Sequence, residues 1–358
     1  MCYEAMLISQ LTPPHPTSSP HATSLIAAKA SAYTPSGITP QQSLVEHYTA
    51  FTSSICLLLT IMSPSPTIAI LSIGQMGLGI ASLLLAHNYR VITNVSDRSP
   101  STQDRAKSAN IACVDTDEEL VQQADYILSI VPPRDAVATA KRVAATKATK
   151  EVWYLDLNAI SPATSRQIRD ILKENESVKM VDGGIIGGPP SQAEDGSWTK
   201  PGIPISGPNK IPDEELITVL NMRLVGKEIG GASGLKCCFA ALSKGFTALA
   251  LQSFTTAAAI GVYDELQYYL EVYNPGAGEK GRRAVVGCTG KAYRWVEEMN
   301  QIGECFAADG GWEAQAMVFR EIAGVFQELA DVVEKEGQGG ISDVKGVVEV
   351  LGDGLRER

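Results

Sequence analysis

The stretch that decides the fold is Thr67–Ser99, which reads TIAILSIGQMGLGIASLLLAHNYRVITNVSDRS. Its first residues, Thr67–Ile73, are a short β-branched and apolar run of the kind that forms a buried parallel strand. A glycine-rich turn follows, and after it come a helical segment at Leu78–Ala86 and a second strand at Arg90–Val95. This order predicts a strand, a tight turn, a helix and a second parallel strand.

The turn has the pattern Ser72-x-Gly74-x-x-Gly77. Small residues there let backbone N–H groups approach a pyrophosphate, whose charge the N-terminus of the following helix stabilises. We therefore expect dinucleotide binding by the turn residues Ser72, Gly74, Gln75, Met76 and Gly77. A glycine turn in an α/β fold that binds another ligand is the alternative. Since serine disfavours a positive φ, Ser72 in the first glycine position predicts a slightly altered turn.

The second strand ends in Asp97-Arg98-Ser99, where a dinucleotide-binding unit reads the ribose of its cofactor. A 2′-phosphate is best recognised by an arginine, whereas a free 2′-hydroxyl is read by a carboxylate. Arg98 and Ser99 supply a cation and a hydroxyl, and Asp97 is a carboxylate that argues for the other choice. We expect NADP as the cofactor, bound by Arg98 and Ser99, with NAD as the alternative.

Length and charge limit the classes of function. With 358 residues the chain is long enough for two domains, and its formal net charge is −10. An acidic chain lacks the basic face that nucleic acid or an anionic membrane would need, so we expect neither partner. No apolar stretch reaches the roughly 18–20 residues that span a bilayer. The seven cysteines show no CxxC spacing, which predicts buried free thiols in a reducing compartment and a cytoplasmic protein.

Three regions differ in pattern. Residues 1–62 are rich in Ser, Thr and Pro, which predicts a disordered extension, or an artefactual one with the true start at Met62. Between 63 and 230 helices and strands alternate, and we expect a Rossmann-type, doubly wound α/β domain. From 231 to 358 no strand pattern occurs, and we expect an all-α domain.

The elements of the helical region are predicted from its apolar segments. Leu235–Tyr273 predicts one or two long helices, and Gly276–Gly281 predicts a loop. Arg283–Ala308 and Glu313–Glu336 predict further helices. In the doubly wound sheet, ligands bind at the carboxyl ends of the strands. The segments expected around one site are therefore Val131-Pro132, Asp156–Pro162 and Asp182–Pro190.

Missing residue types narrow the chemistry. No histidine occurs from Asn88 to Arg358, which excludes histidine-dependent hydride transfer, histidine-based triads and a histidine-bound zinc centre there. We expect no metal. A lysine can transfer a proton if burial or a neighbouring cation lowers its pKa towards neutrality. Lys236, in an apolar helix that follows a glycine-rich junction, is the candidate. The alternative is a structural lysine whose amine reaches water or pairs with an acid.

These motifs together resemble the β-hydroxyacid dehydrogenase superfamily, in its branch of 6-phosphogluconate dehydrogenase-like NAD(P)-binding proteins with a poorly characterised helical C-terminal domain. The matching segments are Gly74–Gly77, Asp97-Arg98-Ser99, Val131-Pro132-Pro133, Asp156–Pro162, Asp182–Gly188, Lys236 and Arg294–Met299. The resemblance implies that Lys236 is catalytic and that Val131 and Pro132 contact the cofactor. It implies that Asn158 and Ser161 orient nicotinamide or substrate, that Ile186, Gly187 and Gly188 form a substrate loop, and that the helical domain binds substrate and forms a homodimer.

The expected function is an NADP-dependent oxidoreductase that transfers hydride between nicotinamide and a carbonyl or alcohol substrate. Lys236 would act as general acid or base, and its retention favours a carbonyl/alcohol couple. A non-catalytic NADP(H)-binding redox sensor or regulator is the alternative, which two departures from the family favour. Ile186 replaces a serine of the substrate loop, and Ala240 replaces an asparagine. The apolar Ile186 also predicts a bulky, uncharged substrate rather than a simple hydroxy acid.

Overall fold

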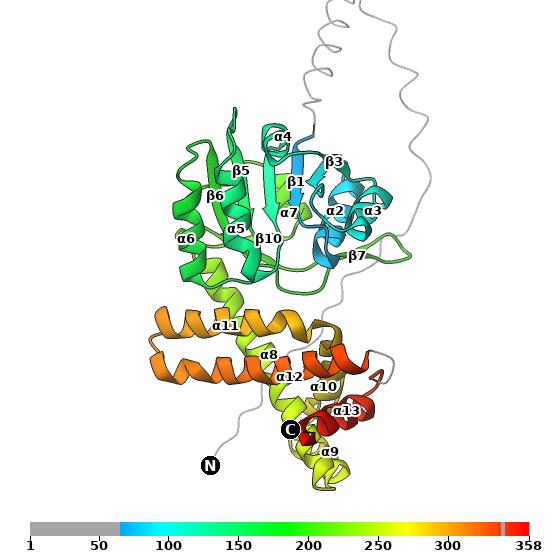
Figure 1. Cartoon of the computed structure of the whole chain (residues 1–358). Helices are drawn as coiled ribbons and strands as arrows, with labels where there is room; N and C mark the ends of the chain where they lie inside the picture. Colours follow the sequence, from blue (N-terminus) through cyan, green and yellow to red (C-terminus); the bar gives the residue numbers. More distant parts are fainter. Residues whose placement is uncertain (1–64, 338–340, 358) are drawn as a thin grey trace, which may run out of the picture. The chain divides into compact units, whose positions relative to one another are not determined.

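The computed structural model describes residues 65–337 and 341–357. The predicted extension at residues 1–62 lies outside the described residues. The described chain begins with an α/β region built on an eight-stranded sheet and continues as a set of helices (Figure 1). The fold class predicted from the sequence, a Rossmann-type sheet followed by a helical region, is confirmed.

The sheet has the strand order β10-β9-β6-β5-β4-β1-β2-β3. Its strands are β1 (Thr67–Leu71), β2 (Arg90–Asn94), β3 (Ala112–Val114), β4 (Tyr126–Ser129), β5 (Val152–Asp156), β6 (Val178–Gly183), β9 (Ile203–Ser206) and β10 (Met222–Gly226). All neighbouring strands are parallel except β6 and β9. β1 lies between β2 and β4, so the strand order reverses there. In an open α/β sheet this reversal places the ligand crevice at the carboxyl ends of β1 and β4.

The antiparallel entry of β9 was not predicted. The chain reaches β9 through a small hairpin, β7 (Ser191–Gln192) and β8 (Trp198–Thr199), rather than through a crossover helix. A parallel neighbour requires a crossover connection, whereas an antiparallel one does not. β3 and the hairpin strands are too short to produce a periodic pattern, which is why the sequence did not reveal them.

Six helices cover the two faces of the sheet. They are α2 (Gln75–Ala86), α3 (Pro100–Ser108), α4 (Asp117–Gln123), α5 (Pro133–Ala144), α6 (Pro162–Leu172) and α7 (Glu214–Val219). Buried side chains of α2, α3 and α7 form one hydrophobic core with the sheet. Those of α4, α5 and α6 form a second core on the other face. The domain is therefore doubly wound, as the alternating sequence pattern predicted.

The helical region is organised around one long helix, α8 (Gly231–Ala259). It is followed by α9 (Tyr263–Tyr273), α10 (Ala277–Cys288), η1 (Thr289–Lys291), α11 (Ala292–Ala308), η2 (Glu313–Met317), α12 (Val318–Glu336) and α13 (Val344–Arg356). α11 and α12 lie side by side and pack on α8 with α10 and α13 (Figure 1). Their buried side chains form a third core, separate from the two on the sheet.

One element prediction for this region is wrong. Gly276–Gly281, predicted as a loop, lies mostly within α10. Gly281 faces Phe254, and a Cβ there would come within 2.8 Å of the ring, so this glycine serves close helix packing instead of breaking the helix. The predicted helical segment Arg283–Ala308 is helical throughout, as the second half of α10, η1 and α11. The expectation of buried thiols is wrong for Cys113 and Cys238, which are exposed.

Among the described residues, α8 is the one helix long and apolar enough to pass a length-and-composition test for a membrane span, so the prediction that no apolar stretch has this length is wrong by that test. Of its most apolar window, 44% is buried inside the protein. A core helix of a folded domain passes the same test, so this finding is weak evidence for a membrane span.

Candidate functional site

The glycine turn between β1 and α2 has the shape that close approach of a phosphate requires. Ser72 adopts a φ of 85°, the left-handed conformation that glycine would take, at a typical cost of about 1–2 kcal/mol. The sequence predicted that Ser72 would alter the turn slightly, but the φ of Ser72 is one that glycine would adopt at this position. At Gly77 a Cβ would lie 2.1 Å from the carbonyl oxygen of Ser72, so only glycine fits. Gly74 begins α2 without any side-chain cap, which leaves the N-terminus of α2 free to bind an anion.

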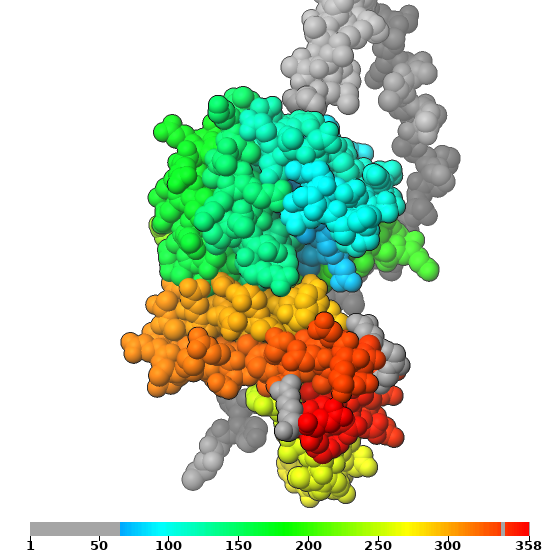
Figure 2. All heavy atoms as spheres, viewed as in Figure 1, coloured from blue at the N-terminus to red at the C-terminus, as the bar shows by residue number. Residues whose placement is uncertain are grey.

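This turn forms one wall of a cavity of about 430 Å³. The residues at the end of β4 form a second wall, and the segment from Gly290 to Glu298 of η1 and α11 forms a third. Of the predicted cofactor residues, the cavity brings together Ser72, Gly74, Gln75, Met76, Gly77, Val131 and Pro132. α11 thus closes a cleft that would otherwise open at the edge of the sheet, and Figure 2 shows it directly against the α/β region.

Arg98 and Ser99 lie outside the set of residues that line this cavity. The side chain of Arg98 is 44% exposed, and its Nε lies 3.2 Å from Oδ1 of Asp97. The hydroxyl of Ser99 faces those of Ser101 and Thr102 at the start of α3. Sequence reasoning missed Arg105, which does line the cavity. Its position on a helix face after β2 was the available signal.

Asn158 is buried, and both polar groups of its side chain are used within the protein. Its Oδ1 accepts a hydrogen bond from the backbone N–H of Val131 at 2.7 Å, and its Nδ2 donates to Ser129 Oγ at 3.0 Å. These bonds join the end of β4 to the end of β5. Next to it, burial and the charge of Asp182 raise the pKa of Asp156 to about 7, while a hydrogen bond from the Asn158 N–H opposes the rise.

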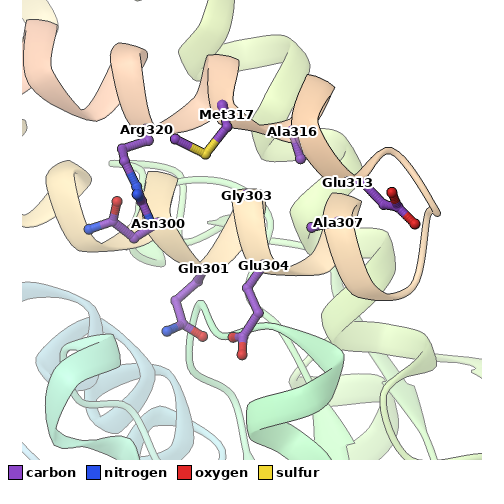
Figure 3. Close-up of a pocket in the computed structure, with 9 residues that line it drawn as sticks. All are labelled: Asn300, Gln301, Gly303, Glu304, Ala307, Glu313, Ala316, Met317 and Arg320. Atoms are coloured by element: carbon purple, nitrogen blue, oxygen red, sulfur yellow. The ribbon is translucent and has the colours of Figure 1, made fainter.

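Ser161 is also buried and holds the start of α6. Its hydroxyl accepts from the N–H of Thr164 and donates to Glu304 Oε2 at 2.5 Å, while its own N–H donates to Gln301 Oε1 at 2.9 Å. Figure 3 shows Gln301 and Glu304 projecting from the same side of α11. They also border a cavity of about 550 Å³ against η2 and α12, which none of the predicted site residues lines. Ser161 therefore links α6 to α11.

Lys236 lies near the start of α8, and its amine donates a hydrogen bond to the carbonyl oxygen of Ile185. The stem of the side chain packs against Gly184, where a Cβ would come within 3.0 Å of Lys236 Cβ. Burial, followed by the positive charges of Lys244 and Arg294, lowers the pKa of Lys236 to about 8, and Glu298 opposes this shift. Arg294 and Glu298 also line the cavity at the glycine turn. Lys236 itself is not among the residues that line this cavity, but two charged groups of the cavity wall act on its amine.

Lys244 is not a free amine. Its Nζ lies 2.7 Å from Glu298 Oε2, and their side chains are only 10% and 14% exposed. The same amine lies 5.2 Å from the centre of the Trp295 ring. The pair joins α8 to α11. Because its charge is already balanced by a carboxylate, Lys244 is poorly suited to bind an anionic substrate.

The start of α8 is anchored by the carboxylate of Asp182, which is fully buried at the end of β6. Its Oδ1 accepts from the hydroxyls of Ser165 and Ser233. Its Oδ2 accepts from one hydroxyl and three backbone N–H groups, those of Ser206, Gly230, Ala232 and Ser233. A negative charge at a helix N-terminus is favourable. Asp182 therefore fixes the position of the N-terminus of α8, and with it the position of Lys236 in the first turns of that helix.

The predicted substrate loop lies apart from the cavity at the glycine turn. Ile186 pairs with Gly202 through two backbone hydrogen bonds and lines a different cavity, beside Leu235 of α8. Gly187, with a φ of 126°, and Gly188 are exposed. The expectation of a bulky, uncharged substrate, which rests on the apolar Ile186 in place of a serine, stays a prediction. Within the described residues, no group of three metal-binding side chains is found.

Comparison with known proteins agrees with this architecture. Residues 67–202 match the NAD binding domain of 6-phosphogluconate dehydrogenase, and residues 257–329 match a domain of unknown function, DUF1932. The uncharacterized 28.5 kDa protein in the 7S RNA 5′ region of Methanothermus fervidus is 30% identical over 240 residues, which are 64% of this chain and 88% of that protein.

Two solved structures share the fold. A conserved protein of unknown function, described as structurally similar to 3-hydroxyacid dehydrogenases, is 26% identical with a TM-score of 0.54 over 74% of this chain and 97% of that one. The 3-hydroxyisobutyrate dehydrogenase of Mycobacterium tuberculosis, solved with L-serine, is 17% identical with a TM-score of 0.55 over 80% of this chain and 99% of that one. The second likeness is one of fold alone.

Proposed function

Because the chain belongs to the β-hydroxyacid dehydrogenase superfamily, in the branch that joins a 6-phosphogluconate dehydrogenase-like NAD-binding domain to DUF1932, we propose that it is an NADP-dependent oxidoreductase. It transfers hydride between nicotinamide and a carbonyl or alcohol substrate. The observation that carries this proposal is Lys236, an amine with a pKa of about 8 whose charged neighbours line the dinucleotide cleft.

The residues of the glycine turn fit a dinucleotide. The close contact at Gly77 leaves no room for a side chain, and the uncapped N-terminus of α2 offers N–H groups to a pyrophosphate. Asn158 holds the N–H of Val131 and so fixes the opposite wall of the cleft. We assign Asn158 and Ser161 as positioning residues, since their polar groups are bound within the protein. The bound nicotinamide supplies or accepts the hydride.

Lys236 transfers the proton. In reduction its ammonium group donates a proton to the carbonyl oxygen of the substrate, and in oxidation its neutral amine accepts the proton of the hydroxyl. A pKa near 8 makes both forms available around neutral pH, which general acid–base catalysis requires. The hydrogen bond to the Ile185 carbonyl, together with the packing against Gly184, holds the amine in one orientation.

The test replaces Lys236 by methionine, which keeps an apolar stem and removes the titratable amine. Purified protein and NADPH are first screened against ketones, aldehydes and imines to find a substrate. Lys236→Met is expected to lower turnover by about 10²–10⁴-fold while NADPH affinity barely changes. Lys345→Met, an exposed lysine of α13, is the matched control and should behave as wild type. Turnover of Lys236→Met within threefold of wild type would contradict the assignment.

The same screen separates the second candidate function. Tight NADPH binding without turnover of any compound would favour a non-catalytic NADP(H)-binding sensor. Such a protein would need the dinucleotide cleft but no proton donor, so Lys236→Met would leave all its properties unchanged. The low pKa of Lys236 favours the enzyme.

We also propose a homodimer formed through α8. Four large apolar side chains at helical spacing, Leu235, Phe239, Leu242 and Leu249, are exposed on this helix, and Leu242 is 79% exposed. Exposed apolar side chains gathered on one helix face in this way are typical of an interface. Sedimentation of the Leu242→Glu variant is expected to give a monomer where wild type gives a dimer. A wild-type monomer at micromolar concentration would refute the proposal.

A further inference from the structure

We propose that Arg105, rather than Arg98, recognises the 2′-phosphate of NADP(H) and so determines the choice of cofactor. The inference rests on the proposed function, because it assumes that a dinucleotide binds at the turn between β1 and α2. Arg105 lies on α3, the helix that follows β2, and it lines the same cavity as Ser72 and Gly74.

The guanidinium of Arg105 is held in place at the turn. Its Nη1 donates a hydrogen bond to the carbonyl oxygen of Ile73 at 2.7 Å, and its side chain is half-buried. An arginine carries five N–H donors in a planar fork, and this contact uses one of them. None of the ion pairs found in residues 65–337 and 341–357 includes Arg105, so its charge is not neutralised by a carboxylate. A fixed, unpaired guanidinium beside a cavity is suited to bind a phosphate.

Arg98 is arranged differently. It is paired with Asp97, whose other oxygen lies 3.9 Å from Nη1 of Arg142, and it does not line the cavity. Binding a phosphate would require Arg98 to leave that carboxylate, and Asp97 would repel the incoming anion. Arg105 has neither cost. The acids that line the cavity, Glu297 and Glu298, lie on α11, and Glu298 is paired with Lys244.

The position of Arg105 matches the adenosine end of a dinucleotide. In this class of fold the pyrophosphate lies at the N-terminus of the first helix, and the adenosine ribose lies between the glycine turn and the end of the second strand. Arg105 reaches the turn at Ile73 from the helix that follows that second strand. A 2′-phosphate on this ribose would meet the free N–H groups of Arg105, whereas a 2′-hydroxyl carries no charge for them to bind.

The experiment measures the dissociation constants of NADPH and NADH by fluorescence titration for wild type and variants. Arg105→Ala is expected to weaken NADPH binding by about 10–100-fold and NADH binding by less than about threefold. Arg105→Lys keeps the charge but loses the fork, and should recover part of the NADPH affinity. Lys107→Ala removes a positive charge from an exposed position of the same helix and is the matched control.

Equal losses for both dinucleotides, or no loss in Arg105→Ala, would overturn the inference. So would a larger loss of NADPH affinity in Arg98→Ala than in Arg105→Ala. If Arg105→Ala does not fold, as judged by circular dichroism, the comparison of Arg105→Lys with wild type decides in the same way. A wild-type protein that binds neither dinucleotide contradicts the proposed function itself. Wild-type binding of NADPH with unchanged selectivity in the variants contradicts only the role of Arg105.

Discussion

Replacing Asp182 should remove the anchor of α8. Its carboxylate is fully buried. The Oδ1 oxygen accepts hydrogen bonds from two hydroxyls. The Oδ2 oxygen accepts hydrogen bonds from one hydroxyl and three backbone N–H groups. In Asp182→Ala the hydroxyls can rotate towards other acceptors and the Ala232 N–H keeps Ser206 Oγ, but the N–H groups of Gly230 and Ser233 lose their acceptor. Each buried donor left without an acceptor costs about 1–3 kcal/mol, and such costs are not additive. We expect a loss of about 3–6 kcal/mol in the free energy of unfolding.

Asp182→Asn should cost much less. Its amide oxygen can stay with the three N–H groups, and its NH₂ group can donate to the hydroxyls of Ser165 and Ser233, which can turn to accept. We expect a loss of about 1–2 kcal/mol, since a charged acceptor is replaced by a neutral one. The comparison separates the role of hydrogen bonding from that of charge.

The assay is urea denaturation followed by circular dichroism, with the slope of the transition compared between variants. Asp104→Asn, an exposed acid on α3, is the control and should change stability by less than about 0.5 kcal/mol. Asp182→Ala should also lose turnover, because Lys236 is carried by the helix that this carboxylate positions. An Asp182→Ala variant within about 1 kcal/mol of wild type would refute the reasoning.

Three further outcomes are expected. The rate of carbonyl reduction should fall as pH rises through about 8, since Lys236 must be protonated to donate, and the rate of alcohol oxidation should rise over the same range. A pH-independent rate between 6 and 10 would exclude this lysine as the proton donor. Lys244→Met should destabilise the fold by about 3–5 kcal/mol in urea melts, because it leaves Glu298 largely buried without its partner. Adding Glu298→Gln should restore part of this lost stability, and an equal or greater loss in the double variant would contradict the role of the ion pair. Gly77→Ala should abolish NADPH binding, since the new Cβ would meet the carbonyl of Ser72, and unchanged affinity in a titration would argue against binding at this turn.

The family and the coarse fold could be read from the sequence because their signals are local. The apolar run of β1, the small residues at positions 72, 74 and 77 and the alternation of helices and strands are set by steric and burial requirements of neighbouring residues. The cap of α6 is equally local, with Ser161 before Pro162. The matches to the NAD-binding and DUF1932 families confirm the resemblance that these motifs suggested.

The site itself depended on contacts between distant residues. The sequence indicated Lys236 as a lysine in apolar surroundings, but its environment comes from Ile185 and from charges on α11, which no spacing reveals. The charge on Arg98 was visible, whereas its pairing with Asp97 and its distance from the cavity were not. Backbone pairing with Gly202 places Ile186 at a cavity beside Leu235, a neighbour that no spacing in the sequence reveals.

Sequence alone therefore determined that this chain has a dinucleotide-binding α/β region and a helical region, and it indicated one candidate lysine. Tertiary structure alone decided which cations face the cleft, which polar side chains are already occupied, and how α11 closes the site. The physical reason is the separation along the chain of the residues that determine each property. Secondary structure and glycine turns follow from neighbours within a few residues, while a pKa, an ion pair or a cavity wall follows from groups brought together across more than fifty positions of the chain, as at Lys236 and Ile185.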